Sequence, residues 1–156
     1  MSETTFAEDL APILNENLDG WSRANALRFL KASPEEVIAE IRIGPQHLQP
    51  YGLVHGGVHA GLIETLASVG AALQVLPQGR SAVGLENTTS FLRAVRQGTL
   101  CGTARPLTRG KTTQVWQVEV KDERGRLVSI GRVRLLCPEA DTPIAGAPTR
   151  LRPGGD

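Results

Sequence analysis

Apolar residues recur at three- and four-residue steps along one stretch of the chain, residues 56–76. The series consists of Val58, Leu62, Leu66, Val69, Leu73 and Leu76. This spacing is typical of an α-helix. The positions between them are mostly glycine, alanine and serine, so other elements can approach the helix axis on several sides. The pattern predicts one long central helix that is apolar and buried nearly all round.

Short alternating or β-branched runs predict the strands. They cover residues 26–32, 37–43, 82–93, 99–107, 112–121 and 127–136. Turn residues at 97–98, 109–110 and 123–125 separate the last four runs, and each predicts a hairpin between antiparallel neighbours. One long helix with a series of antiparallel strands predicts an α+β fold.

The two ends of the chain differ from this core. Residues 6–18 have apolar positions at helical spacing, which predicts a short helical cap within residues 1–20. From residue 138 onward proline, glycine, alanine and threonine dominate without periodicity, which predicts a disordered tail over residues 138–156. The sequence therefore predicts one domain over residues 1–137.

Length and charge exclude several classes of protein. A chain of 156 residues with 40% hydrophobic content suits a single core. Its 17 basic and 16 acidic side chains nearly cancel, which argues against a nucleic-acid or membrane partner. Two cysteines, Cys101 and Cys137, are too few for a disulfide framework and indicate a reducing compartment. Residues 1–17 are acidic and do not resemble a secretory signal, so we expect a cytoplasmic protein.

One charged side chain, Glu64, lies in the apolar helix between Val58 and Leu76. A carboxylate there argues against a membrane span. If buried, it needs a partner or a shifted pKa, as groups at catalytic sites often do; the alternative is a solvent-facing residue or half of an ion pair. Ser68, one turn later, is placed to hold a water for Glu64, or to bond back to the Glu64 carbonyl.

Gly56 and Gly57 begin the same helix. Free N–H groups in a first turn suit a carbonyl oxygen that becomes negative in a transition state; the alternative is that the glycines only let the loop enter the helix. Seven residues separate Gly57 from Glu64, about 10 Å along a helix. The amide and the carboxylate of one helix therefore cannot contact the same carbonyl group. If both act, they come from two copies of the chain, which predicts a dimer with shared sites.

The three histidines suggest a metal site at first, because His55 and His59 are one helical turn apart. No acidic residue or cysteine pair stands where further ligands would be expected. A polar loop role for His55 and a surface role for His59 are favoured, and no metal is expected.

Basic residues gather at strand ends and hairpins, where they would meet a phosphorylated ligand or simply be solvated. They are Arg93, Arg96, Arg105, Arg109 and Lys111.

Residues 49–57, Gln-Pro-Tyr-Gly-Leu-Val-His-Gly-Gly, followed by Glu64 and Ser68, resemble the signature of hotdog-fold acyl-CoA thioesterases with a glutamate on the helix. The resemblance runs from about residue 46 to 136 and includes 83–85, 89–93 and 109–116. Within this family, the residues most resemble the branch that includes a 4-hydroxybenzoyl-CoA thioesterase and the thioesterases of menaquinone and enterobactin synthesis. It implies a hotdog fold, in which a curved antiparallel β-sheet wraps the central helix. It also implies a homodimer as the minimal unit, a homotetramer, and active sites at the dimer interface.

The resemblance also implies residue roles. Glu64 would be the nucleophile or general base, and the Gly56 N–H would bind the thioester oxygen. The expected catalytic residues are Glu64, Gly56, Gln49, His55 and Ser68. The expected substrate-binding residues are Gly57, Arg93, Thr112 and Thr113. A thioester is already an activated acyl donor, so no cofactor or metal is needed.

One position departs from the pattern. The menaquinone and enterobactin members are expected to have a histidine near Phe91 that reads ring hydroxyls, and here the aligned residue is apolar. This favours a hydroxybenzoyl- or phenylacetyl-type acyl-CoA. Two alternatives are a non-catalytic acyl-CoA-binding protein and a hotdog hydratase or dehydratase. The latter pairs a histidine with an acid, and the five-residue step from His59 to Glu64 places these two on different helix faces.

Overall fold

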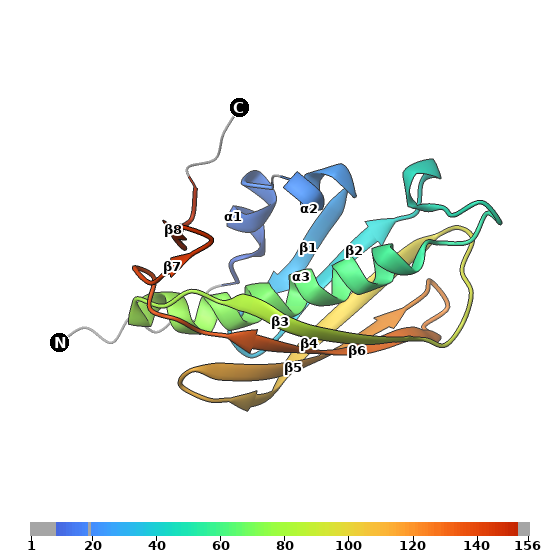
Figure 1. Ribbon diagram of the computed structural model, residues 1–156. Helices are drawn as coiled ribbons and strands as arrows, with labels where there is room; N and C mark the ends of the chain where they lie inside the picture. Colours follow the sequence, from blue (N-terminus) through green and yellow to red (C-terminus); the bar gives the residue numbers. More distant parts are fainter. Residues whose placement is uncertain (1–8, 19, 153–156) are drawn as a thin grey trace.

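A computed structural model describes residues 9–18 and 20–152. The long helix α3 (Gly56–Val75) lies along one face of a six-stranded antiparallel sheet (Figure 1). The strands are β1 (Leu27–Ala32), β2 (Val37–Arg42), β3 (Val83–Phe91), β4 (Thr99–Arg109), β5 (Thr113–Lys121) and β6 (Leu127–Leu136). Each predicted strand matches one of these to within two residues at its ends. The predicted α+β hotdog fold is confirmed.

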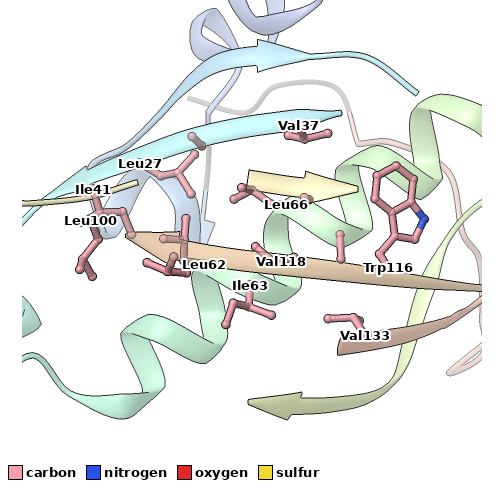
Figure 2. Close-up of a cluster of buried hydrophobic side chains, with 14 of the residues drawn as sticks. Leu27, Val37, Ile41, Leu62, Ile63, Leu66, Leu100, Trp116, Val118 and Val133 are labelled. Atoms are coloured by element: carbon pink, nitrogen blue, oxygen red, sulfur yellow. The ribbon is translucent and has the colours of Figure 1, made fainter. Parts of the chain in front are cut away.

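The core forms between α3 and the sheet because inward positions alternate with outward ones along the strands. Along β5 the inward residues Gln114, Trp116, Val118 and Val120 are all buried. Figure 2 shows Trp116 among the apolar side chains that fill the space beside α3. A Cβ on Gly70 would lie 2.4 Å from the Trp116 ring, so the ring packs directly on the helix backbone. The expected close approach to the helix is confirmed.

The length and apolar composition of residues 56–78 would also suit a membrane span. Here α3 packs against β2, β3, β4, β5 and β6. It is therefore the core helix of the domain.

Strand β3 does not pair with the strand that follows it in sequence. The order in the sheet is β1-β2-β4-β5-β6-β3, so β3 pairs with β6. Residues 92–98 therefore connect β3 to β4 across the positions of β6 and β5, which lie between them in the sheet. The hairpin predicted at residues 97–98 is therefore wrong, whereas those at 109–110 and 123–125 join paired strands. As a result β3 is an edge strand, and most of its side chains are exposed in the single chain.

The N-terminal region contains two short helices, α1 (Ala11–Glu16) and α2 (Gly20–Ala24). The predicted cap helix agrees with α1 over its described part, and residues 6–8 lie outside the described residues. Helix α2 was not predicted. Its Trp21 lies on Gly61 of α3, where an added Cβ would come within 2.2 Å of the ring.

Two short 3-10 helices lie before and after α3 in the chain. They are η1 (Pro45–His47) and η2 (Leu76–Gln78).

The described part of the C-terminal segment, residues 138–152, differs from the expected disordered tail. It contains a short hairpin of β7 (Pro143–Ile144) and β8 (Ala147–Pro148). The segment lies beside the C-terminal end of α3 (Figure 1), where Ala140 donates a hydrogen bond to the Gly79 carbonyl. Backbone hydrogen bonds thus order this segment, although its sequence lacks the apolar periodicity of a buried element.

Candidate active site

The first turn of α3 leaves one backbone amide available. His55 is the N-cap residue, and its Nδ1 accepts a hydrogen bond of 2.8 Å from the Gly57 N–H. The amide of Gly57 is therefore already used, which is contrary to the expectation of two free glycine amides. The Gly56 N–H has no acceptor among the described residues. The helix start can thus offer the Gly56 amide to a carbonyl oxygen, with the helix dipole in support.

A cavity of about 410 Å³ opens in front of Gly56. Its walls come from the loop before α3, from α3 itself and from the end of β3 with the loop that follows. The lining residues are Gln49, Leu53, Val54, Gly56, His59, Phe91, Leu92, Arg93, Ala94 and Val95. The Gln49 side-chain oxygen accepts a hydrogen bond from the Tyr51 N–H, which leaves its NH₂ group as a donor for a ligand. The cavity thus combines an apolar lining with a few polar groups, as ligand pockets do.

His59 forms part of the cavity floor and is only 4% exposed, so the predicted surface role is wrong. Its Nδ1 and the hydroxyl of the buried Ser129 share a hydrogen bond of 2.9 Å. Its ring meets that of Phe91 edge-on, with the ring centroids 5.9 Å apart. Burial lowers the pKa of His59 below its ordinary value, which favours the neutral imidazole.

Glu64 faces away from this cavity and is exposed in the single chain, so the expectation of a buried carboxylate is wrong for one copy. It lines a second, smaller cavity of about 160 Å³ with Gly84, Leu85, Glu86, Asn87 and Val133. A Cβ on Gly84 would lie 3.1 Å from Glu64 Oε1, so the carboxylate lies against the first part of β3. Ser68 is half-buried one turn further on, and the hydrogen bonds of the described residues include none from its hydroxyl to the Glu64 carbonyl. The Ser68 hydroxyl is therefore available for another partner.

The expected site residues fall into two groups at opposite ends of β3. Gln49, His55, Gly56 and Arg93 lie at the Phe91 end. Glu64 belongs to the other end, near Gly84, and Ser68 follows it by one helical turn. Thr112 and Thr113 belong there too. Thr113 is opposite Leu136, which in turn is opposite Val83 at the start of β3. One chain therefore does not bring Glu64 to the Gly56 cavity.

Most of the other basic residues have partners within the protein. Arg105 pairs with Glu36, and Arg109 lies 3.9 Å from Glu35. Arg96 donates to the Tyr51 carbonyl at 2.8 Å. The described ion pairs include none for Arg93 or Lys111, and of these two residues Arg93 lines the cavity. Arg93 is therefore the candidate from this set for contact with a ligand.

His47 is fully buried and has a structural role, because its two ring nitrogens bond the Gly44 N–H and the Asn25 carbonyl. The described residues contain no group of three or more histidine, cysteine or acidic side chains arranged to hold a metal.

Sequence reasoning placed Phe91 near the acyl group but missed the contribution of His59 and Ser129. A signal for His59 was present, because it precedes the buried Leu62, Ile63 and Leu66 at helical spacing. Ser129 gives no comparable signal, since its contact with His59 spans seventy residues of sequence.

Comparisons with known proteins show which proteins the chain is similar to in sequence and fold. Residues 51–129 match the model of the thioesterase superfamily. A Mycobacterium tuberculosis protein named as an esterase is 40% identical over 116 residues, which cover 73% of this chain and 83% of that protein. The 1,4-dihydroxy-2-naphthoyl-CoA hydrolase of Escherichia coli is 35% identical over 107 residues, 69% of this chain and 78% of the relative. The crystal structure of a Haemophilus influenzae thioesterase superposes with a TM-score of 0.78 at 28% identity, covering 83% of this chain and 90% of that one.

Proposed function

Because the chain belongs to the thioesterase superfamily and is an acyl-CoA thioesterase, we propose that two copies share each active site. Glu64 of one copy acts on a thioester held at the Gly56 cavity of the other. The acyl group is aromatic, of the hydroxybenzoyl or phenylacetyl type.

The observation that carries this proposal is the position of the two half-sites along β3. This strand is at the edge of the sheet, and an exposed edge is a template for pairing with another strand. Two-fold symmetric pairing of β3 with β3 is antiparallel, so the Gly84 end of one strand lies beside the Phe91 end of the other. Glu64 contacts the first end and Gly56 the second. The pairing therefore brings the acid of one copy towards the free amide of its partner, and removes Glu64 from open solvent.

The chemistry follows from the groups that this pairing unites. The Gly56 N–H and the Gln49 NH₂ group stabilise the negative oxygen that develops when the thioester carbonyl is attacked. Glu64 either takes a proton from water, which then attacks the carbonyl carbon, or attacks that carbon itself. The C–S bond breaks, and coenzyme A leaves as a thiolate that is then protonated. In the water route the free acid forms at once, whereas direct attack leaves an anhydride between the acyl group and Glu64, which water then hydrolyses to the free acid and the Glu64 carboxylate. Ser68 orients the attacking water, and neither route needs a cofactor.

The lining of the Gly56 cavity supports an aromatic acyl group. Apolar side chains form most of its wall, and the Phe91 ring stands at its side. A ring stacked on or edge-on to Phe91 gains contact energy beyond simple burial. The Escherichia coli relative named for an aromatic CoA thioester is consistent with this substrate class.

The same pairing explains how three residues far apart in one chain serve the coenzyme A tail. Arg93 lies at the Phe91 end of β3, and Thr112 and Thr113 lie near its Val83 end. In the pair, Arg93 of one copy and both threonines of the other lie at the same end of the joined strands. A guanidinium with hydroxyl groups suits a phosphorylated tail.

We place the enzyme in the cytoplasm, as a homotetramer built from two such dimers. The support for this compartment is the low cysteine content, Cys101 and Cys137 alone, which is too little for a disulfide framework. Its partners are an acyl-CoA substrate and copies of itself, with no nucleic acid or membrane.

The test is steady-state hydrolysis of aromatic, short-chain and long-chain acyl-CoA thioesters, followed with a thiol-detecting reagent. We expect turnover on aromatic acyl-CoA, and a loss of about 10²- to 10⁴-fold in Glu64→Gln with substrate binding retained. Glu119→Gln is the matched control, because Glu119 is a β5 carboxylate whose partner among the described ion pairs is Lys121. Wild-type turnover no faster than background on all three substrate classes would overturn the proposal. Unchanged turnover in Glu64→Gln would overturn the role of Glu64.

A further inference from the structure

His59 places a polar atom at the floor of an otherwise mostly apolar cavity. It lies three residues after Gly56 on α3, a rise of about 4.5 Å. Helical side chains lean towards the N-terminal end of their helix, so the imidazole lies behind the first turn. There it lines the cavity while remaining only 4% exposed.

Only one of the two ring nitrogens of His59 is occupied. Nδ1 bonds the Ser129 hydroxyl at 2.9 Å, and the described residues provide no partner for Nε2. Every fully buried side-chain nitrogen or oxygen in the described part of the chain has a hydrogen-bond partner. Nε2 is therefore not sealed in the core, and the cavity that His59 lines is the space open to it.

The surroundings hold the imidazole in one orientation. Ser129 is fully buried on β6, where its backbone pairs with β3 at Phe91 and with β5 at Val120. Phe91 fixes the other side of the ring by its edge-on contact at 5.9 Å. A ring held on two sides gives directional recognition, because little rotamer freedom is lost when a ligand binds.

We propose that His59 determines acyl-group specificity, with Nε2 forming a hydrogen bond to a neutral oxygen substituent, a hydroxyl or carbonyl, on the part of the acyl group farthest from the thioester. This rests on the proposed function, in which the thioester carbonyl binds at the Gly56 amide. The acyl group then runs along Phe91, which touches both Gly56 and His59. Ser129 is a positioning residue, because its hydroxyl bonds Nδ1 and so holds the ring in place.

The chemistry favours a neutral substituent over a charged one. Burial lowers the pKa of His59, so the ring is neutral and presents one N–H or one lone pair. A carboxylate in this position would face a neutral imidazole that offers it no charge, and it loses more by leaving water than a neutral hydroxyl or carbonyl does. A site built to bond an oxygen also discriminates against the substrate that lacks it, since Nε2 would then be buried unpaired.

The test compares benzoyl-CoA with its 2-, 3- and 4-hydroxy derivatives in wild type, His59→Asn, His59→Gln and His59→Leu. Asn retains an amide near Nδ1 and loses Nε2, whereas Gln places an amide near Nε2. We expect wild type to prefer one hydroxylated isomer by about tenfold or more in kcat/KM. The preference should fall to within about threefold in His59→Asn and His59→Leu and be partly kept in His59→Gln.

Three outcomes separate the possible failures. Equal losses on hydroxylated and unsubstituted substrates, or an unchanged preference in His59→Leu, would overturn the specificity role while leaving the proposed function intact. No hydrolysis by the wild type would instead overturn the proposed function.

A spectroscopic measurement covers the case in which the His59 variants do not fold. The ¹⁵N resonance of His59 Nε2 is recorded in Glu64→Gln with benzoyl-CoA and then with the preferred hydroxylated isomer. A shift specific to the hydroxylated ligand supports the proposal, and identical spectra overturn it. Ser129→Ala, recorded in the same way, should broaden or move the signal if Ser129 orients the ring.

Discussion

The ring of Phe91 lies against Gly56, at the point where a Cβ on the glycine would come within 2.9 Å of Phe91 Cζ. Phe91 is 59% exposed in the single chain, so a Cβ at Gly56 would push the ring outward from its present position. Any such movement changes the shape of the cavity beside the Gly56 amide.

Gly56→Ala is therefore expected to damage catalysis more than folding. A displaced Phe91 ring misplaces the thioester, and we expect kcat/KM to fall about 10- to 100-fold. The free energy of unfolding should change little, because alanine is favoured over glycine in a helix. In the Phe91→Ala background the same substitution should cost less than about threefold. Equal losses in both backgrounds would show that the contact with Phe91 is not the cause.

Sharing of the site between copies predicts complementation of two defective variants. Glu64→Gln and Gly56→Ala carry different affinity tags, are co-expressed, and the mixed dimer is purified through both tags. One of its two sites then combines an intact Glu64 with an intact Gly56, so the mixed dimer should regain about half of the wild-type turnover. Activity in the mixed dimer no higher than in the parent variants would place the whole site within one chain.

Recognition of the coenzyme A phosphates predicts a split between KM and kcat. Arg93→Gln should raise KM for the preferred acyl-CoA about tenfold with little change in kcat. The N-acetylcysteamine thioester of the same acyl group lacks the phosphates, so its KM should be unaffected. Arg105→Gln is the control, because Arg105 pairs with Glu36. A similar rise in KM for both thioesters would contradict a phosphate contact.

The contact between Gly70 and Trp116 predicts a stability change opposite in sign to helix propensity. Replacing glycine by alanine inside a helix ordinarily stabilises it by about 1 kcal/mol. A Cβ on Gly70 would be 2.4 Å from the fully buried Trp116 ring, so we expect Gly70→Ala to destabilise by about 1–3 kcal/mol. Urea unfolding measures the difference, and an increase in stability would refute the packing.

The buried imidazole of His59 predicts a loss of stability in mild acid. Its pKa is lowered in the folded protein from an ordinary value of 6.5, so below that pH the unfolded chain binds the proton first. Stability from this group is complete above pH 6.5 and falls as the pH drops towards the folded pKa, with a slope of at most about 1.4 kcal/mol per pH unit.

Chemical unfolding of wild type and His59→Asn between pH 7.5 and about 5 measures this effect. The slope should be smaller in the variant. Carboxylates with lowered pKa, Asp9, Glu36 and Asp122, act in a more acidic range and are common to both proteins. Identical slopes would exclude His59 as the source.

The sequence predicted local structure well because periodicity is a local property. Helix α3 and the six strands of the sheet follow from the spacing of residues such as Leu62 and Leu66. The position of β3 does not follow, because pairing with β6 rather than β4 depends on contacts between distant parts of the chain. Helix α2 and the hairpin of β7 and β8 were missed for a similar reason, since both are held by contacts with the core or its edges rather than by their own pattern.

The candidate site was predictable where residues are close in sequence, as with Gln49, His55 and Gly56, which the structure gathers around the start of α3. The exposure of Glu64 could not be predicted from the sequence. The helix pattern shows that Glu64 is surrounded by apolar residues, but it does not show which face the single chain leaves uncovered. The helical spacing of His59 indicated a buried position, but the partner that satisfies its ring, Ser129, is seventy residues away in sequence and could not be predicted.

If two copies share each site as proposed, the uncovered edge of β3 links catalytic rate to protein abundance. A working site that needs two polypeptides obeys the law of mass action, so dilution below the dissociation constant leaves inactive halves. At low expression the rate would rise more steeply than in proportion to the amount of enzyme, and would become proportional only once most chains are paired. The strand that completes the chemistry would in this way also set a threshold concentration for it.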